Sequence, residues 1–497
     1  MTTTDEGNLQ IGWASKDVTP DKPVNLQGQF HMRISKGVKD PLCVTALAIS
    51  GENANGLDHV VFLAGDMAYV PEAVEEQVRQ MIRPQIPEMD VAKIVIHATH
   101  THTAPCMEDG FYPPAPDGVM TYREYADFFA TRAAEAIIES WENRQAAKIA
   151  WGVGQAVVGR NRRVVYFDDI SKRPNYVHQP GHRTTRFASM YGKTNDDQFS
   201  HIEGYEDHNV DLLYTFNEKR ELTGVVVNLA CPSQETEGIY FVSADFWHET
   251  RATIRQRLGA NIFILPQCGT AGDQSPHVLW YKQAEERMLK LKGIDSREEI
   301  ARRIARAVEE VLPVVRKDQR HALPLQHIVK TIQLPRRMIN EAEAKLIRSD
   351  IATLEAKPPS VNPDPEKRLK EDSARVTALN RCRLTLARYE QQAHVPAVSI
   401  EFHAIRLGDV AWAMFPFEVF LDYGLRIKAR SPALQTFAVQ LASAGAGWGG
   451  NYLPTARAKT GESYSANVYC NSVGSQGGQV IVEETLKILN KSWRENK

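Results

Sequence analysis

The sequence predicts an α/β chain, of the mixed α+β kind, with layered mixed sheets and flanking helices. Apolar runs of strand length alternate with amphipathic helical patterns along most of the chain. The 497 residues, of which 43% are hydrophobic and 24% charged, can bury a substantial core. We expect a single domain over residues 1–497, with a helical hairpin insertion at 337–393.

Charge, apolar runs and cysteine spacing exclude several classes of function. A net charge of -2 offers no excess of basic residues for nucleic acid or an anionic membrane. The N-terminus lacks the features of a secretory signal, and no run of about 18 apolar residues follows. Six cysteines without a Cys-x-x-Cys pair indicate neither a disulfide scaffold nor a zinc ribbon. We expect a cytoplasmic protein without stable membrane insertion. Homo-oligomer formation stays open.

The N-terminal part alternates strands and helices, and a long irregular segment follows it. Residues 168–207 are rich in His, Arg, Asn, Asp and Gly without any period, which predicts a functional or mobile loop. The expected strands are Leu42–Ser50, His59–Ala64, Lys93–Ala98 and Ile149–Val157, and the expected helices are Pro71–Ile82 and Arg123–Asn143.

The middle of the chain predicts two strand ends with polar or glycine-rich turns. Val210–Phe216 and Leu222–Ala230 form an expected hairpin, and the second strand runs into Ala-Cys-Pro-Ser-Gln. After a helix at Phe246–Leu258, a strand at Asn261–Pro266 leads into the turn Gln267–Ser275. Glycines in such a turn let backbone amides approach a ligand, although the same composition suits a plain turn.

The C-terminal half predicts long charged helices, then strands, then a glycine-dense loop. Two of the helices are joined by a proline-rich linker and form the expected hairpin insertion, either an oligomer contact or a lid. Glu418 is expected at or near the first turn of a helix that the chain enters over 416–424, beside a strand end. The other expected elements are helices at Glu298–Lys317, Asn340–Ala356, Pro365–Gln392 and from about Gln479, strands at Ala397–Leu407 and Val410–Met414, and a loop at Leu441–Ser465.

Three histidines follow the buried strand that begins at Lys93. In an extended chain His100 and His102 point to one face, whereas His97 points to the other. A His-x-His pair suits a divalent transition metal, because such metals favour imidazole nitrogen. The alternative is a hydrogen-bonded structural pair.

Six short motifs lie far apart along the chain: Thr99–His102, Asn161–Arg162, Ser243–Asp245, Gly272–Pro276, Pro416–Glu418 and Asn451–Thr455. In this order they resemble the catalytic domain of the neutral/alkaline, non-lysosomal ceramidase family, over roughly Ile11 to Lys491. In that family an immunoglobulin-like domain follows the catalytic domain. We expect no C-terminal immunoglobulin-like domain in this chain.

The resemblance implies a zinc amidase whose metal is held by two histidines, a glutamate and a tyrosine. Position by position, it implies His100, Glu418 and Tyr452 as ligands and His102 as a neighbouring active-site imidazole. The chain departs from the family at the second histidine. The matching position, fourteen residues before Asp245, is Cys231. Either the Cys231 thiolate or His248 on the next helix could complete the site, or metal binding is altered or lost.

A zinc site implies hydrolysis by a metal-activated water. His102 would stabilise an oxyanion or relay a proton, and Tyr452 would ligate or donate a hydrogen bond. Arg162 and the turn around Ser275 would shape the substrate or oxyanion pocket. Ser275 as a nucleophile is the weaker alternative, because the sequence has no Gly-x-Ser-x-Gly elbow.

The sequence predicts a small substrate that is polar or anionic, because basic side chains fill the expected loop, although surface solvation explains them equally well. The first hypothesis is a zinc-dependent hydrolase that cleaves the amide bond of a soluble N-acyl compound. The second is a metal-dependent hydrolase or lyase acting on an anionic carbohydrate. The third is a non-catalytic binding protein with a decayed site. The basic residues are Arg160, Arg162, Arg163, His178, His182 and Arg183.

Overall fold

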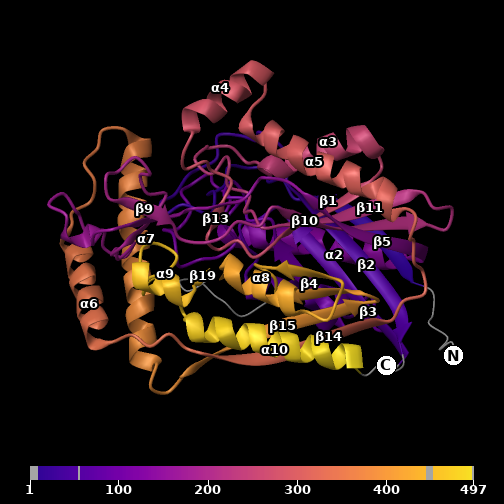
Figure 1. Cartoon of the computed structure of the whole chain (residues 1–497). Coiled ribbons are helices and arrows are strands. Elements are labelled where there is room, and N and C mark those ends of the chain that lie inside the picture. Colours follow the sequence, from indigo (N-terminus) through magenta and orange to yellow (C-terminus); the bar gives the residue numbers. More distant parts are fainter. Residues whose placement is uncertain (1–8, 54–55, 444–451, 495–497) are drawn as a thin grey trace.

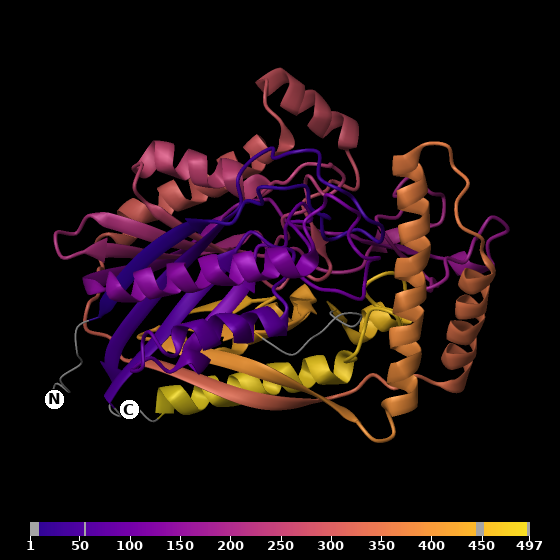
Figure 2. The same cartoon turned by 180° about the vertical axis from the view of Figure 1, so that it is seen from behind.

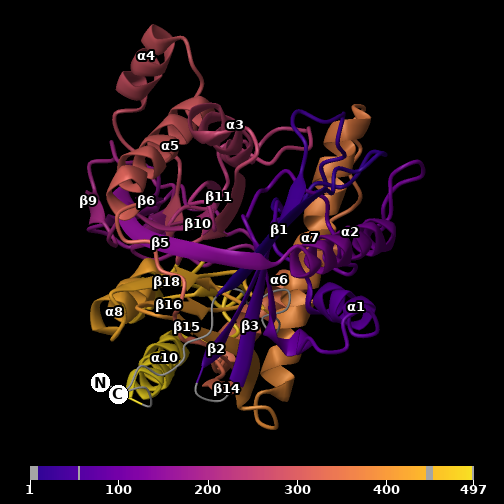
Figure 3. The ribbon, with the colours of Figure 1, turned by 90° about the vertical axis from the view of Figure 1, so that its right-hand side faces the viewer.

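Two β-sheets stack face to face and carry helices on both outer faces, so the body has four layers (Figures 1 and 3). The computed structural model describes residues 9–53, 56–443 and 452–494. The apolar core between the sheets contains Phe62 from one sheet and Trp412 from the other, with ring centroids 5.4 Å apart. The expected class, layered mixed sheets with flanking helices, is confirmed.

The larger sheet has eight strands in the order β12-β11-β10-β5-β1-β2-β3-β4. Neighbouring strands run antiparallel except at its two ends, where β11 pairs with β12 and β3 with β4 in parallel. Both parallel pairs are buried and rich in valine, isoleucine and leucine, as such strands require. The strands are β1 (Gln10–Asp17), β2 (Cys43–Asn53), β3 (Gly56–Gly65), β4 (Ile94–Ala98), β5 (Gln145–Gln155), β10 (Asn209–Asn217), β11 (Leu222–Leu229) and β12 (Phe263–Cys268).

Two helix pairs cover the outer face of this sheet. Helices α1 (Glu72–Ile82) and α2 (Tyr122–Glu142) pack on the half formed by β2, β3 and β4. Helices α3 (Phe246–Leu258) and α5 (Ser296–Val315) pack on the half formed by β5, β10, β11 and β12. The bounds of α3 are those the sequence predicts.

The smaller sheet has four strands in the order β14-β15-β16-β18. Its outer face is covered by α8 (Leu421–Arg430) and α10 (Ser475–Arg494), which share a core cluster with it. No helix within the described residues is long and apolar enough to span a membrane. The strands are β14 (Leu325–Pro335), β15 (Ala397–Leu407), β16 (Val410–Met414) and β18 (Gln435–Val439).

Helices α6 (Glu341–Ala356) and α7 (Pro365–Gln391) form the expected hairpin and stand beside the layered body (Figure 2). Each begins at a residue whose side chain accepts hydrogen bonds from the first turn, Asn340 for α6 and Asp364 for α7. The hairpin packs on Val468 and Tyr469 of the body through a small apolar cluster. That the hairpin is an insertion, and that the chain is one domain, stay predictions.

The structure corrects the expected position of Glu418. It lies on the short strand β17 (Glu418–Val419), and α8 begins only at Leu421. Strand β17 pairs in parallel with β19 (Tyr452–Leu453), and in that register Glu418 lies opposite Tyr452. Helix α8 therefore begins five residues after Pro416, because Phe417 and Val419 are buried in the core rather than on a helix face.

Several helices and strands of the structure were not predicted from the sequence. Strands β1 and β14 and the exposed helix α4 (Lys282–Lys292) were not expected. The expected loop at 168–207 holds two short strands that pair with β7 (Arg163–Tyr166). The smaller elements are η1 (Val91–Lys93), β6 (Arg160–Asn161), η2 (Ile170–Lys172), β8 (Ala188–Met190), β9 (Phe199–Ile202), β13 (Gln274–Ser275) and α9 (Ala456–Gly461). The glycines at 445, 447, 449 and 450, with Asn451, lie outside the described residues.

The buried Glu75 on α1 gives the fold a pH dependence. Burial raises its pKa to about 8, Arg79 opposes the rise and Glu401 adds to it. Between pH 4.5 and 8 the unfolded chain loses this proton and the folded chain keeps it, so stability falls as pH rises through this window. Glu75→Gln is expected to raise the free energy of unfolding by about 1–3 kcal/mol at pH 8, and to leave it nearly unchanged at pH 4.

Urea unfolding of both proteins at the two pH values measures this difference. The exposed Glu72 on the same helix provides the matched control, because Glu72→Gln is expected to change stability little at either pH. An equal effect of Glu75→Gln at pH 4 and pH 8 would contradict the assignment.

Candidate active site

A cavity of about 90 Å³ opens beyond the carboxyl end of β4, and three polar side chains meet in its lining. His100 and His102 come from the segment after β4, and Glu418 comes from β17. Tyr452 and Tyr464 contribute aromatic walls from the C-terminal part of the chain.

His100 is held by the backbone of the segment that follows β3. Its φ of 66° is left-handed, and its backbone N–H donates to the carbonyl of Met67 over 2.9 Å. Its Nδ1 lies 2.6 Å from the carbonyl oxygen of Ala68, which can only accept, so Nδ1 carries a proton. The other ring nitrogen, Nε2, lies 3.1 Å from Oε2 of Glu418.

Glu418 and Tyr452 meet because β17 and β19 pair in register. Burial acts to raise the pKa of Glu418, but the charges of His100 and Arg162 and the hydrogen bonds of His100 and Tyr452 outweigh it and hold this pKa below its ordinary value. The hydroxyl of Tyr452 accepts a hydrogen bond from Nη2 of Arg162 over 3.2 Å. A buried carboxylate, a phenol and a guanidinium therefore share one end of the cavity.

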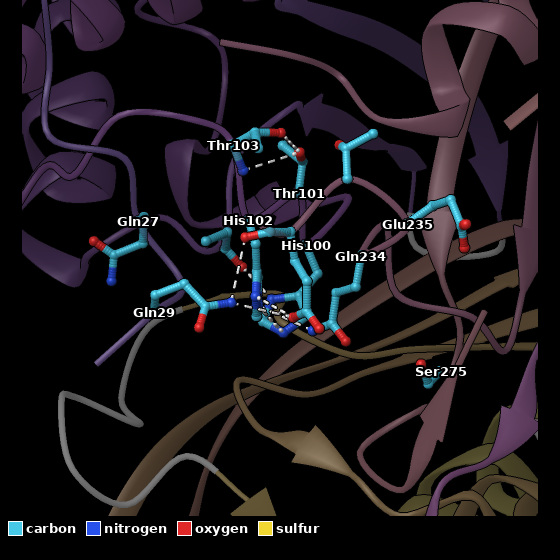
Figure 4. A network of polar contacts seen from close by, with 12 residues as sticks. Gln27, Gln29, His100, Thr101, His102, Thr103, Gln234, Glu235 and Ser275 are labelled. Carbon is cyan, nitrogen blue, oxygen red and sulfur yellow. Dashed lines mark hydrogen bonds and ion pairs between the residues drawn. The ribbon is translucent and has the colours of Figure 1, made fainter. Parts of the chain in front are cut away.

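His102 lies beside His100, with ring centroids 4.8 Å apart and the two Nε2 atoms separated by 3.4 Å (Figure 4). Its Nδ1 is 3.2 Å from Oε2 of Glu237, and its Nε2 accepts from the amide of Gln234 over 2.9 Å. Burial lowers the pKa of His102 to about 4, and Glu237 opposes this only in part. The ring is therefore neutral at pH 7, with the unprotonated Nε2 toward His100.

Glycine is required at position 28 for this ring to fit. The backbone of Gly28 has a φ of 103°, and a Cβ there would lie 2.3 Å from Cγ of His102. The residue thus combines a backbone conformation that favours glycine with direct contact to a site imidazole.

Arg162 and Ser275 are both buried behind the cavity. Arg162 donates to Oε1 of Gln234 over 3.2 Å and to the carbonyl of Gly272 over 3.0 Å. The Ser275 hydroxyl accepts from the Tyr191 hydroxyl over 3.0 Å and does not line the cavity within the described part of the chain. Arg162 is in place to act on the site, whereas Ser275 supports the wall behind it.

Cys231 and His248 lie apart from the cavity. Cys231 packs in the apolar core between β11, β12 and α3, and burial raises the pKa of its thiol well above the ordinary value. His248 lies in the first turn of α3, half-buried. Neither is among the described residues that line the cavity. Gln234, three residues beyond Cys231, reaches His102 instead.

The donor set fits part of a zinc site. Across residues 9–53, 56–443 and 452–494, no three histidine, cysteine, aspartate or glutamate side chains form a group that could hold a metal ion. Even so, Nδ1 of His100 carries its proton toward Ala68, so Nε2 faces Oε2 of Glu418 in a contact that needs a proton or a metal ion between the two atoms. Their separation of 3.1 Å is close to the roughly 3.3 Å expected between two such donors on a tetrahedral zinc.

Helix α7 packs against the loops that form the outer wall of the cavity. Asn380 donates to the carbonyl of Phe111, and Ser373 accepts from the backbone of Met32. Arg381 donates to the carbonyl of Gly181 over 2.9 Å, lies 4.6 Å over the ring of Phe30 and lines the cavity itself. The hairpin therefore positions the loops that shape the substrate space.

Sequence reasoning missed Gln234, Glu237 and Arg381. Gln234 and Glu237 lie in the run Gln-Glu-Thr-Glu just after the end of β11. A polar run at a strand end was the sequence signal for these two residues, but the family resemblance matched Cys231, three residues before Gln234, to the metal ligand. Nothing local marks Arg381, because only the docking of α7 on the body places it at the cavity.

Comparison with known proteins shows a fold relationship. No family model matches the chain, and no curated protein matches it. The structure of a neutral ceramidase from Pseudomonas aeruginosa superposes with a TM-score of 0.64 and 15% identity, over 98% of this chain and 75% of that chain. A ceramidase complexed with C2 gives 0.63 and 13%, over 99% and 76%. The expected ceramidase-like fold is confirmed.

Proposed function

We propose that the chain is a zinc-dependent hydrolase that cleaves the amide bond of a small N-acyl compound. The observation that carries the proposal is the facing pair of His100 Nε2 and Glu418 Oε2, with the Tyr452 hydroxyl beside them. The ceramidase structures that share the fold point to the same class of reaction.

His100, Glu418 and Tyr452 would hold the ion, since imidazole, carboxylate and phenolate are donors that zinc accepts. Zinc, when bound, supplies Lewis acidity that polarises a carbonyl and activates water. Cys231 and His248 are the sequence-based candidates for a further ligand, although both lie outside the cavity lining. Comparing the metal content of Cys231→Ser with that of His248→Ala tests whether either contributes.

The other polar residues have roles that follow from their contacts. The neutral His102 accepts a proton on Nε2 and returns it to a leaving amine, because Glu237 holds its Nδ1 side. Arg162 places a fixed positive charge beside Tyr452, where negative charge would develop on a substrate oxygen. Aromatic walls and the amide of Gln27 bind the rest of a compact substrate.

Glu237→Gln is expected to lower kcat by roughly 10–100-fold and to leave KM nearly unchanged. Glu237 orients His102 but does not line the cavity within the described residues, so substrate binding is spared. Steady-state amine release measures both constants.

Glu206→Gln is the matched control, because Glu206 lies 3.3 Å from His208 in a partly exposed pair of the same kind. A fall in kcat of the same size in both variants would contradict a specific role for Glu237.

A second candidate function keeps the site and changes the substrate to an anionic carbohydrate. Arg381 lines the cavity with no carboxylate partner among the described residues, and Phe30 and Tyr464 add ring surfaces. Such a wall suits a sugar ring that bears a carboxylate.

A substrate panel separates the two functions. N-acyl amines and N-acyl amino acids are assayed for free amine, and uronic-acid oligosaccharides for unsaturated or reducing products. The proposal expects amine release that Glu418→Gln abolishes. Products from the oligosaccharides alone would select the second function, and no product from any substrate would favour a binding protein.

A further inference from the structure

A second cavity, of about 310 Å³, lies where β14 ends and α10 begins. Arg336, Arg337 and Lys459 contribute three cationic side chains to its lining. No acidic residue belongs to this lining within the described part of the chain. The cavity is therefore a concentrated positive site.

Several guanidinium nitrogens around this cavity have no hydrogen-bond partner among the described residues. Arg337 donates from Nη2 to Glu343 over 2.7 Å, but its Nη1 is buried and has no hydrogen-bond partner among the described residues. The same holds for Nε of Arg336 and for Nε and Nη1 of Arg388. Buried donors without partners are costly, and each calls for a missing acceptor.

The charge balance points the same way. Burial, together with the nearby charges of Arg337 and Arg336, lowers the pKa of Arg388 to about 9. Glu343 is the carboxylate paired with this group of guanidiniums in the described structure. Three buried or half-buried cations that share one carboxylate leave a deficit of negative charge.

Helix α10 adds to the positive potential. It runs for 20 residues from Ser475, and Ser475 and Gln476 of its first turn line the cavity. The amino end of a long helix carries partial positive charge and unpaired N–H groups, which favour an anion. The helix only supplements the positive charge of the arginines.

We propose that this second cavity binds a doubly charged oxyanion, a phosphate or sulfate group, held chiefly by Arg336 and Arg337. The fork of a guanidinium matches two oxygens of such a group, and both arginines line the cavity. Lys459, exposed on α9, adds charge at the mouth.

The oxyanion site lies back to back with the candidate active site. Cys470 lines the first cavity, whereas Asn471 lines the second and donates from Nδ2 to the carbonyl of Tyr452 over 3.0 Å. The inference does not depend on the proposed hydrolase activity, and its test uses no substrate of that activity.

Isothermal titration with inorganic phosphate, at constant ionic strength maintained with chloride, tests the site. One phosphate per chain is expected to bind. Arg336→Gln is expected to weaken binding about tenfold, since it removes a charge-assisted donor. The ion pair of the described residues at this place is made by Arg337 and not by Arg336, so the substitution leaves it intact. Arg306→Gln, at an exposed position on α5 outside the cavity, is the matched control and should bind as the natural chain does.

Lys459→Gln provides a second variant in case Arg336→Gln does not fold, and a weaker loss of two- to fivefold is expected from it. Phosphate binding no tighter than chloride, or binding that both variants retain in full, would overturn the proposal. Glycerol phosphate distinguishes the sources of the group: tighter binding than inorganic phosphate assigns the site to an organic phosphate, and equal or weaker binding assigns it to the free ion.

Discussion

His100→Ala is expected to remove bound zinc and to lower amide hydrolysis by roughly 10³-fold or more. The side chain supplies the one imidazole nitrogen that faces Glu418, and its other nitrogen is fixed by the carbonyl of Ala68. No other described side chain offers a nitrogen in the same place, although His102 lies next to it. Metal analysis and amine release, measured on the same preparation, check both expectations.

His201→Ala is the control for this variant, because His201 is exposed on β9 and contacts only Ser200 among the described hydrogen bonds. It should keep both zinc and turnover. A His100→Ala protein that retains its full zinc content would refute the ligand assignment, even if activity fell.

Arg163→Met is expected to cost about 3–5 kcal/mol of stability. The guanidinium is fully buried and meets the buried Glu203 with two hydrogen bonds, of 2.6 and 3.1 Å. It also donates to the carbonyls of Glu462 and Tyr464. Methionine fills the space of the stem but leaves a buried carboxylate and these carbonyls without a donor.

The midpoint of urea unfolding measures this loss, and Arg186→Met is the control because Arg186, in the segment 168–207, is exposed. The variant should also lose activity at temperatures well below its unfolding, since Tyr464 lines the cavity. Equal unfolding midpoints for Arg163→Met and Arg186→Met would contradict the account of the buried pair.

The sequence predicted the meeting of His100 and His102, but for the wrong geometric reason. Alternation along a strand placed them on one face, whereas β4 ends at Ala98 and the left-handed backbone of His100 turns the two rings together. The apolar run before them was a reliable strand signal, because strongly buried parallel strands leave a continuous apolar pattern. Side-chain directions beyond the strand end had no such signal.

Glu418 and Tyr452 could be linked only through the family resemblance, since the 32 residues 420–451 separate the two short strands that pair them. Strand β14 carries Lys330 and Thr331 in its middle, so its pattern is mixed and reads as a connection. Gln234 and Arg381 reach the site through tertiary packing, which periodicity along the chain does not record.

The most direct test measures amine release from an N-acyl substrate before zinc is removed, after it is removed and after it is added back. Treatment with a chelator should abolish turnover, and one zinc per chain should restore it in the natural chain but not in Glu418→Gln. Chelated, metal-free protein that hydrolyses the substrate at its original rate would contradict the central claim.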